Sequence, residues 1–104
     1  MSDPMAVFRE KFRQRCAVDR ERLVHALEAW RQGDANAHGE LVAIIHGLAG
    51  AGGTFGFSSL SDHAMEAEAR LLDTTSHDSA IHGELINGLL EELSGIEAGE
   101  IPPK

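Results

Sequence analysis

Residues 43–57 read AIIHGLAGAGGTFGF, a stretch in which an apolar helical period runs into a series of glycines. The period is carried by Leu41, Ile44, Ile45 and Leu48. Five of the eleven residues from His46 to Gly56 are glycine. Each glycine inside a helix costs roughly 0.5–1 kcal/mol relative to alanine. The period still predicts a helix, so its glycines are expected to serve something other than the stability of that helix.

Two apolar segments precede this helix. The first contains Met5, Phe8, Phe12 and Cys16, and the second contains Leu23, Leu27 and Trp30. Spacings of three and four residues predict amphipathic helices in both. The apolar stripe shifts around residues 17–19, which predicts a short N-terminal helix followed by a second helix, either separate from it or continuous with a bend. Gly33 is expected to end the second helix.

Two further helices are predicted after the glycines. One extends to about Leu72, and the other follows the polar break DTTSHD at residues 73–78. The apolar positions of the last helix are Ile81, Leu85, Leu89, Leu93 and Ile96. Segments typical of strands are missing from the sequence, and it has no tyrosine. We therefore predict an all-α fold over residues 1–98, an antiparallel four-helix bundle with a short additional N-terminal helix, and a disordered tail at 99–104.

The composition of the chain limits its class. Its 104 residues, 42% of them hydrophobic, fit one domain with one modest core. The formal net charge of −8 disfavours nucleic acid and anionic membranes as partners. The apolar runs are too short for a membrane span or a signal peptide, so we expect a cytoplasmic monomer. The single cysteine, Cys16, is expected to be a small buried hydrophobe.

The charge is distributed unevenly along the chain. Residues 1–32 carry seven Lys and Arg against five Asp and Glu, whereas residues 33–104 carry two against twelve. The basic residues are concentrated at Arg9, Lys11, Arg13, Arg15, Arg20 and Arg22. They form either a solvated helix face with acidic neighbours or a docking patch for an acidic partner. The sequence favours the solvated face.

His46 is the candidate functional residue. On a helical wheel at about 100° per residue, the apolar face of its helix is centred roughly 200–220° away from it. Outer helix faces normally carry long charged side chains, yet the residues around His46 are small. They are Gly39, Ala43, Ala49, Gly50 and Gly53, together with Val42. A surface without long side chains around one imidazole predicts a partner that approaches closely.

The remaining histidines follow no recognisable pattern of a metal site. They are His25, His38, His63, His77 and His82, and none belongs to a zinc motif such as His-Glu-x-x-His. His63 is expected at the edge of the core. We expect no bound metal or other cofactor. The sequence also lacks the Gly-x-x-x-x-Gly-Lys-Ser/Thr loop that binds a nucleotide, which argues against kinase activity.

The residues that follow His46 resemble the histidine phosphotransfer (HPt) domain of two-component phosphorelays. The family pattern has Leu two residues after its phosphoacceptor His, Gly four, an apolar residue nine, Gly ten and Leu fourteen residues after it. The matching positions here are Leu48, Gly50, Phe55, Gly56 and Leu60, followed in the next helix by Ala64 and Glu68. His63 and Ala67 depart from positions that are usually more apolar. The resemblance covers nearly the whole chain.

The resemblance implies a phosphocarrier with no kinase activity of its own, in which His46 is the phosphoacceptor. Its partners would be response-regulator receiver domains and a hybrid histidine kinase, with Mg²⁺ bound on the receiver. The expected partner-binding residues are Val42, Ala43, Gly47, Ala49, Gly50 and Gly53. The family often has lysine three residues after the phosphoacceptor, where this chain has Ala49. Without this lysine, the charge of the phosphoryl group is neutralised by the receiver's lysine and metal or by an arginine of the N-terminal segment, or the phosphorylated form is less stabilised.

Three other functions compete with phosphotransfer. The first is a bundle that is never phosphorylated and binds a receiver domain through the Gly/Ala patch around His46, and the missing lysine at position 49 favours it. The second is a metal-binding or redox bundle, which only the number of histidines supports. The third is an autonomous kinase, which lacks a nucleotide-binding motif. The sequence favours phosphotransfer over all three.

Overall fold

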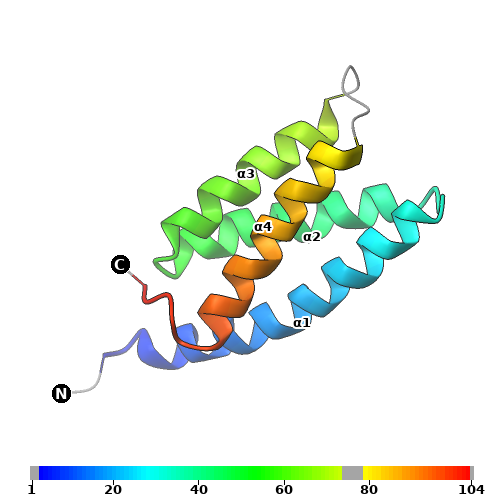
Figure 1. Cartoon of the computed structure of the whole chain (residues 1–104). Helices are drawn as coiled ribbons and strands as arrows, with labels where there is room; N and C mark the ends of the chain where they lie inside the picture. Colours follow the sequence, from blue (N-terminus) through cyan, green and yellow to red (C-terminus); the bar gives the residue numbers. More distant parts are fainter. Residues whose placement is uncertain (1–2, 74–78, 104) are drawn as a thin grey trace.

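The computed structural model describes residues 3–73 and 79–103. Within them the chain forms four helices, α1 (Ala6–Arg31), α2 (Ala37–Thr54), α3 (Ser58–Leu72) and α4 (Ser79–Glu97). Successive helices run antiparallel, and each packs on two others, with α1 and α3 both contacting α2 and α4 (Figure 1). The prediction of an all-α four-helix bundle is confirmed. Most of the predicted polar break lies outside the described residues. No helix of the described segments is long and apolar enough to cross a bilayer.

The N-terminal segment forms one helix, so the predicted short additional helix is wrong. α1 is continuous over 26 residues, and Gly33 follows its end with φ +90°. The error comes from Asp19, which occupies a core-facing position between Cys16 and Leu23. Because two arginines bind its carboxylate, Asp19 can be buried where the pattern required an apolar side chain. The helical period therefore continues through residues 17–19.

The glycine-rich end of α2 packs closely against α3. A Cβ on Gly52 would lie 3.2 Å from the backbone nitrogen of Ser61 and 3.3 Å from the carbonyl oxygen of Phe57. Gly56, in the connection between the two helices, has φ +88°, a conformation that side chains disfavour. These two glycines serve the fold, one in helix packing and one in the turn.

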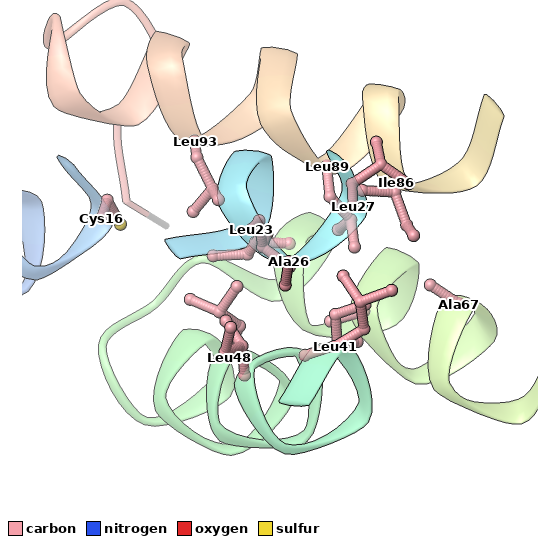
Figure 2. Close-up of a cluster of buried hydrophobic side chains, with 14 of the residues drawn as sticks. Cys16, Leu23, Ala26, Leu27, Leu41, Leu48, Ala67, Ile86, Leu89 and Leu93 are labelled. Carbon is pink, nitrogen blue, oxygen red and sulfur yellow. The ribbon is translucent and has the colours of Figure 1, made fainter. Parts of the chain in front are cut away.

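The four helices enclose one hydrophobic core (Figure 2). Its members include the predicted apolar residues Leu41, Ile44, Ile45, Leu48, Leu89, Leu93 and Ile96. Cys16 is fully buried, as predicted, and burial raises the pKa of its thiol to about 12. Phe12 stacks on both Phe55 and Phe57, which joins α1 to the turn after α2. Phe8, predicted on the apolar stripe, is instead half-exposed.

Residues 99–103 turn back toward the bundle, whereas the sequence predicted a disordered tail. Gly99 has φ +78°, and the N–H groups of Glu100 and Ile101 donate to the carbonyl of Gly95 at 2.8 and 3.2 Å. Ile101 packs against the hydrophobic core. A Cβ on Gly95 would lie 2.7 Å from the Ile101 side chain, so the glycine provides the space for this contact. Pattern analysis of either segment alone does not reveal such a pairing.

Candidate functional site

His46 lies on the outer face of α2, as the helical wheel predicted. Its side chain is 76% exposed, whereas Leu48 on the same helix is fully buried. Ala43, Gly50 and Gly53, three of the small residues predicted around it, are also exposed. A Cβ on Gly50 would meet nothing within 4 Å beyond the local helix backbone. Packing within the chain therefore does not require glycine at this position.

The other predicted partner-binding residues are half-buried. They are Val42, Gly47 and Ala49. The side chains of Val42 and Ala49 pack against the hydrophobic core, so only part of each faces solvent. Of the small residues predicted around His46, Gly39, Ala43, Gly50 and Gly53 are therefore the exposed ones, and Val42, Gly47 and Ala49 contribute only part of their surface.

Glu68 of α3 holds the imidazole of His46. The Nδ1 atom of His46 lies 2.7 Å from Oε2 of Glu68, whose side chain is only 21% exposed. This contact depends on close packing of α2 on α3. The absent side chain at Gly52 permits that packing, and the Ser61 hydroxyl supports it by donating to the carbonyl of Ala49 at 2.6 Å.

The sequence identified Glu68 only as part of the family pattern and assigned it no contact with His46. The two residues lie 22 positions apart on different helices, and a wheel drawn for one helix does not show which residues of two helices meet. A usable signal was present in α3. Glu68 follows Ser61 by seven residues, so the two share one helix face, and Ser61 contacts α2.

The contact with Glu68 determines which nitrogen of His46 is free to react. An ionised carboxylate only accepts hydrogen bonds, so Nδ1 carries the hydrogen that it donates to Glu68. The Nε2 atom of the neutral ring then has a free lone pair. A carboxylate in this position also stabilises the positive charge that develops on the ring when Nε2 forms a new bond. The arrangement is suited to nucleophilic attack on an electrophile that a partner brings.

Arg15 of α1 approaches α2 at Gly47, the residue that follows His46. Its Nη2 atom lies 3.1 Å from the place where a Cβ on Gly47 would be, so the guanidinium rests against the α2 backbone. Its Nε atom donates to Oδ2 of Asp19 at 3.1 Å. The carboxylate of Asp19 is 5% exposed and also accepts a hydrogen bond from Arg22 at 3.2 Å.

Most of the basic residues of α1 pair with acidic neighbours. The pairs are Arg9–Asp3, Arg13–Glu10, Arg15–Asp19, Arg20–Glu97 and Arg22–Asp19. Each arginine side chain stays partly exposed. These pairs support the solvated helix face that the sequence favoured.

The other described histidines make different contacts. The Nδ1 atom of His63 lies 2.8 Å from Oε1 of Glu92 on α4, and this hydrogen bond raises the pKa of His63. Although the sequence placed His63 at the edge of the core, its side chain is 60% exposed. His82 is buried against the ring of Trp30. His77 lies outside the described residues. Across residues 3–73 and 79–103, no group of three or more His, Cys, Asp or Glu could hold a metal ion.

A groove of about 430 Å³ lies between α3 and α4 and does not include His46. Its lining contains His63 and Glu92, with Leu85 and Ile101 among the apolar residues. His46 is instead presented on an open helix surface. Such a surface suits contact with a protein partner better than enclosure of a small substrate.

A family model described as Hpt domain matches residues 7–99. The matched range covers nearly all of the four helices and includes both His46 and Glu68. No curated protein and no solved structure gives a significant match to the chain.

Proposed function

The chain belongs to the Hpt domain family, and from that premise we propose that His46 relays a phosphoryl group between phosphoaspartates of response-regulator receiver domains. Members of this family are phosphocarriers in phosphorelays, where they interact with receiver domains and kinases. The observation that carries the proposal is the exposed imidazole of His46, with its Nδ1 atom held by Glu68. This contact leaves Nε2 as the atom that would be phosphorylated.

His63 resembles His46 in one respect, because a carboxylate also holds its Nδ1 atom. Its surroundings are different. The groove next to it is lined by Glu66, Glu84, Glu91 and Glu92. Their negative charge would repel an incoming phosphoryl group. Apart from Glu68, the exposed surface next to His46 consists mainly of Gly and Ala residues, which favours His46 as the phosphoacceptor.

In the proposed transfer, the lone pair of His46 Nε2 forms a bond to the phosphorus of an aspartyl phosphate on the receiver. The bond between phosphorus and the aspartate oxygen breaks, and its electron pair stays on the aspartate carboxylate. The hydrogen on Nδ1 remains in its hydrogen bond to Glu68, which stabilises the positive charge of the ring. Transfer to a second receiver reverses these changes.

We expect the receiver to supply Mg²⁺ and a lysine that neutralise the phosphoryl group. The helix that carries His46 contains no Lys or Arg, so the neutralising cation has to come from outside α2. Ala49 occupies the position at which the family often has lysine. Phosphoryl transfer depends mainly on positioning and on neutralisation of charge, so a chain of this kind needs to provide little beyond the nucleophile and a docking surface.

Gly50 supports a close approach of the receiver. The Nε2 atom has to come within about 3 Å of phosphorus, so the surface of α2 must lie almost against the partner. Gly50 lies one turn after His46, and no contact among the described residues requires glycine there. We propose that contact with the receiver is the reason for this glycine. The rest of the proposed partner surface consists of Val42, Ala43, Gly47, Ala49 and Gly53.

The test uses phosphorylated receiver domains, Mg²⁺ and a label on the phosphoryl group. Wild-type protein and the His63→Gln variant should acquire acid-labile, alkali-stable label, and His46→Gln should acquire none. Label on His46→Gln would contradict the proposal. If no receiver labels the wild type while binding is intact, the result supports a module that binds receivers without being phosphorylated.

Two glycine variants test the docking surface. Gly50→Gln places a neutral side chain next to His46 and should slow transfer at least about tenfold, because it holds the receiver away from Nε2. Gly88→Gln is the matched control, since Gly88 is also exposed on a helix, with nothing within 4 Å of its Cβ position. Equal transfer rates for the two variants would remove Gly50 from the proposed surface.

A further inference from the structure

We propose that Arg15 is a phosphoryl-binding residue of this carrier, whose guanidinium contacts the phosphoryl oxygens on His46 from the side of α1. Asp19 would be the residue that positions it. The inference rests on the proposed phosphorylation of His46. The inference goes beyond that proposal because it names a cation that this chain itself contributes.

The position of Arg15 is the first observation behind the proposal. Its Nη2 atom lies 3.1 Å from the Cβ position of Gly47, the residue that directly follows His46. A guanidinium can lie so close to the backbone because Gly47 has no side chain. Arg15 therefore brings positive charge to α2 at the level of the phosphoacceptor.

The hydrogen bonds of Arg15 are the second observation. Asp19 accepts from Nε at 3.1 Å, which fixes one edge of the guanidinium. The carboxylate is 5% exposed, and Arg22 binds its other oxygen, so Asp19 is itself held in place. The side chain of Arg15 remains 47% exposed. Its Nη donors can therefore bind phosphoryl oxygens while Nε stays on Asp19.

The distribution of charge around His46 is the third observation. Phosphorylation would add a dianion to His46, next to the carboxylate of Glu68. The helix that carries His46, α2, contains no Lys or Arg. On α3 the only Lys or Arg is Arg70, in the last turn. Arg70 follows Glu68 by two residues and so lies roughly 200° away from it around the helix. Arg15 is therefore the arginine that the described contacts place against Gly47, the residue that directly follows the phosphoacceptor.

The test uses the full chain phosphorylated by phosphoramidate, which releases ammonia and needs no protein partner. Phosphorus NMR follows the phosphohistidine signal against pH in the wild type and in Arg15→Gln. A bound cation favours the dianion, so Arg15→Gln should raise the second pKa of the phosphoryl group by about 0.5–1. Transfer from a phosphorylated receiver should slow by about tenfold in the same variant.

Arg22→Gln is the matched control. Arg22 binds the same carboxylate, has a similar exposure of 51% and lies two turns further along α1. A structural effect transmitted through Asp19 would therefore appear equally in both variants. Direct contact with the phosphoryl group affects Arg15→Gln much more, because Arg22→Gln leaves the hydrogen bond between Arg15 and Asp19 in place.

A shift of the phosphoryl pKa that is clearly larger in Arg15→Gln than in Arg22→Gln supports the proposal. Equal values in both variants and the wild type overturn it and leave phosphorylation of His46 intact. Equal shifts in both variants also overturn the proposal. The shift would then come from the loss of one positive charge on α1, or from a displacement of Asp19, and not from contact of Arg15 with the phosphoryl group. If neither phosphoramidate nor a phosphorylated receiver labels His46, the proposed function fails, and this inference fails with it.

Discussion

At the residue scale, the chemistry of the candidate site depends on one hydrogen bond between two helices. Glu68 accepts from Nδ1 of His46 and so leaves Nε2 unprotonated in the neutral ring. The same type of pair occurs between His63 and Glu92, in a groove rich in glutamates. The two pairs differ in the charge and size of the residues around them, and this difference makes each pair a control for the other.

Removal of the Glu68 carboxylate should slow phosphorylation of His46. In Glu68→Ala the ring is free to adopt the other tautomer, and the positive charge formed during attack loses its partner, so we expect a rate about tenfold lower. The initial rate of labelling by phosphoramidate measures this effect. Glu92→Ala removes the equivalent contact from His63 and should label at the wild-type rate. A wild-type rate for Glu68→Ala would show that Nδ1 needs no carboxylate.

The His63–Glu92 pair should make the stability of the bundle depend on pH. The hydrogen bond that the ring of His63 donates to the Glu92 carboxylate raises the pKa of His63 above its ordinary 6.5, although burial opposes the shift. Because the folded pKa is the higher one, the stabilisation is fully present below pH 6.5 and is lost as pH rises through the folded pKa.

His63→Gln should therefore lower the free energy of unfolding more at pH 5.5 than at pH 8.5. Urea unfolding at both pH values measures this difference. This difference between the two pH values should become smaller when His63→Gln is made in a Glu92→Gln background, because only the weaker effects of Glu66 and Asp62 then raise the pKa of His63. A loss of stability that is the same at both pH values would show that protonation of His63 does not contribute.

At the scale of the helices, the sequence predicted most elements correctly because each helix shows its own apolar period. The exception is the division of α1, which arose at Asp19. A buried carboxylate between apolar positions looks like an interruption until its partners are known. Those partners, Arg15 and Arg22, lie within one turn of it on the same helix, at spacings of four and three. Charge pairing along the helix, taken together with the apolar period, would have predicted one continuous helix.

Two glycines of α2 should respond in opposite ways to substitution by alanine. Gly50→Ala should raise the free energy of unfolding by about 0.5–1 kcal/mol, because the site is open and alanine favours the helix. Gly52→Ala should lower it by about 1–3 kcal/mol, because the new Cβ meets backbone atoms of Ser61 and Phe57 that cannot move independently. Urea unfolding of both variants and of the wild type measures these changes in the free energy of unfolding. Equal effects at the two positions would contradict the packing described for α2 and α3.

At the scale of the whole molecule, the sequence predicted the direction of His46 but not its contact with Glu68 or the contact of Arg15 with the neighbouring Gly47. The direction follows from the period of one helix. The contact with Glu68 depends on the register between α2 and α3, and the approach of Arg15 depends on the register between α1 and α2. Neither register is set by a pattern within one helix. Sequence analysis also did not predict that Ile101 packs back against α4, since this contact depends on the space that the missing side chain of Gly95 leaves there.

Cys16 offers a probe of how the molecule opens as a whole. Its side chain is fully buried, and burial raises the pKa of the thiol to about 12, so the folded protein should hold almost no reactive thiolate at pH 8. Reaction with a thiol reagent should then require opening of the core between α1 and its neighbours. When opening and closing are fast, the labelling rate follows the open population. Gly52→Ala should therefore accelerate labelling by about tenfold for each 1.4 kcal/mol of stability lost, and Gly50→Ala should slow it. Rapid labelling of the native protein at a rate that neither variant changes would mean that Cys16 is reached by a local motion, independent of the packing of α2 on α3.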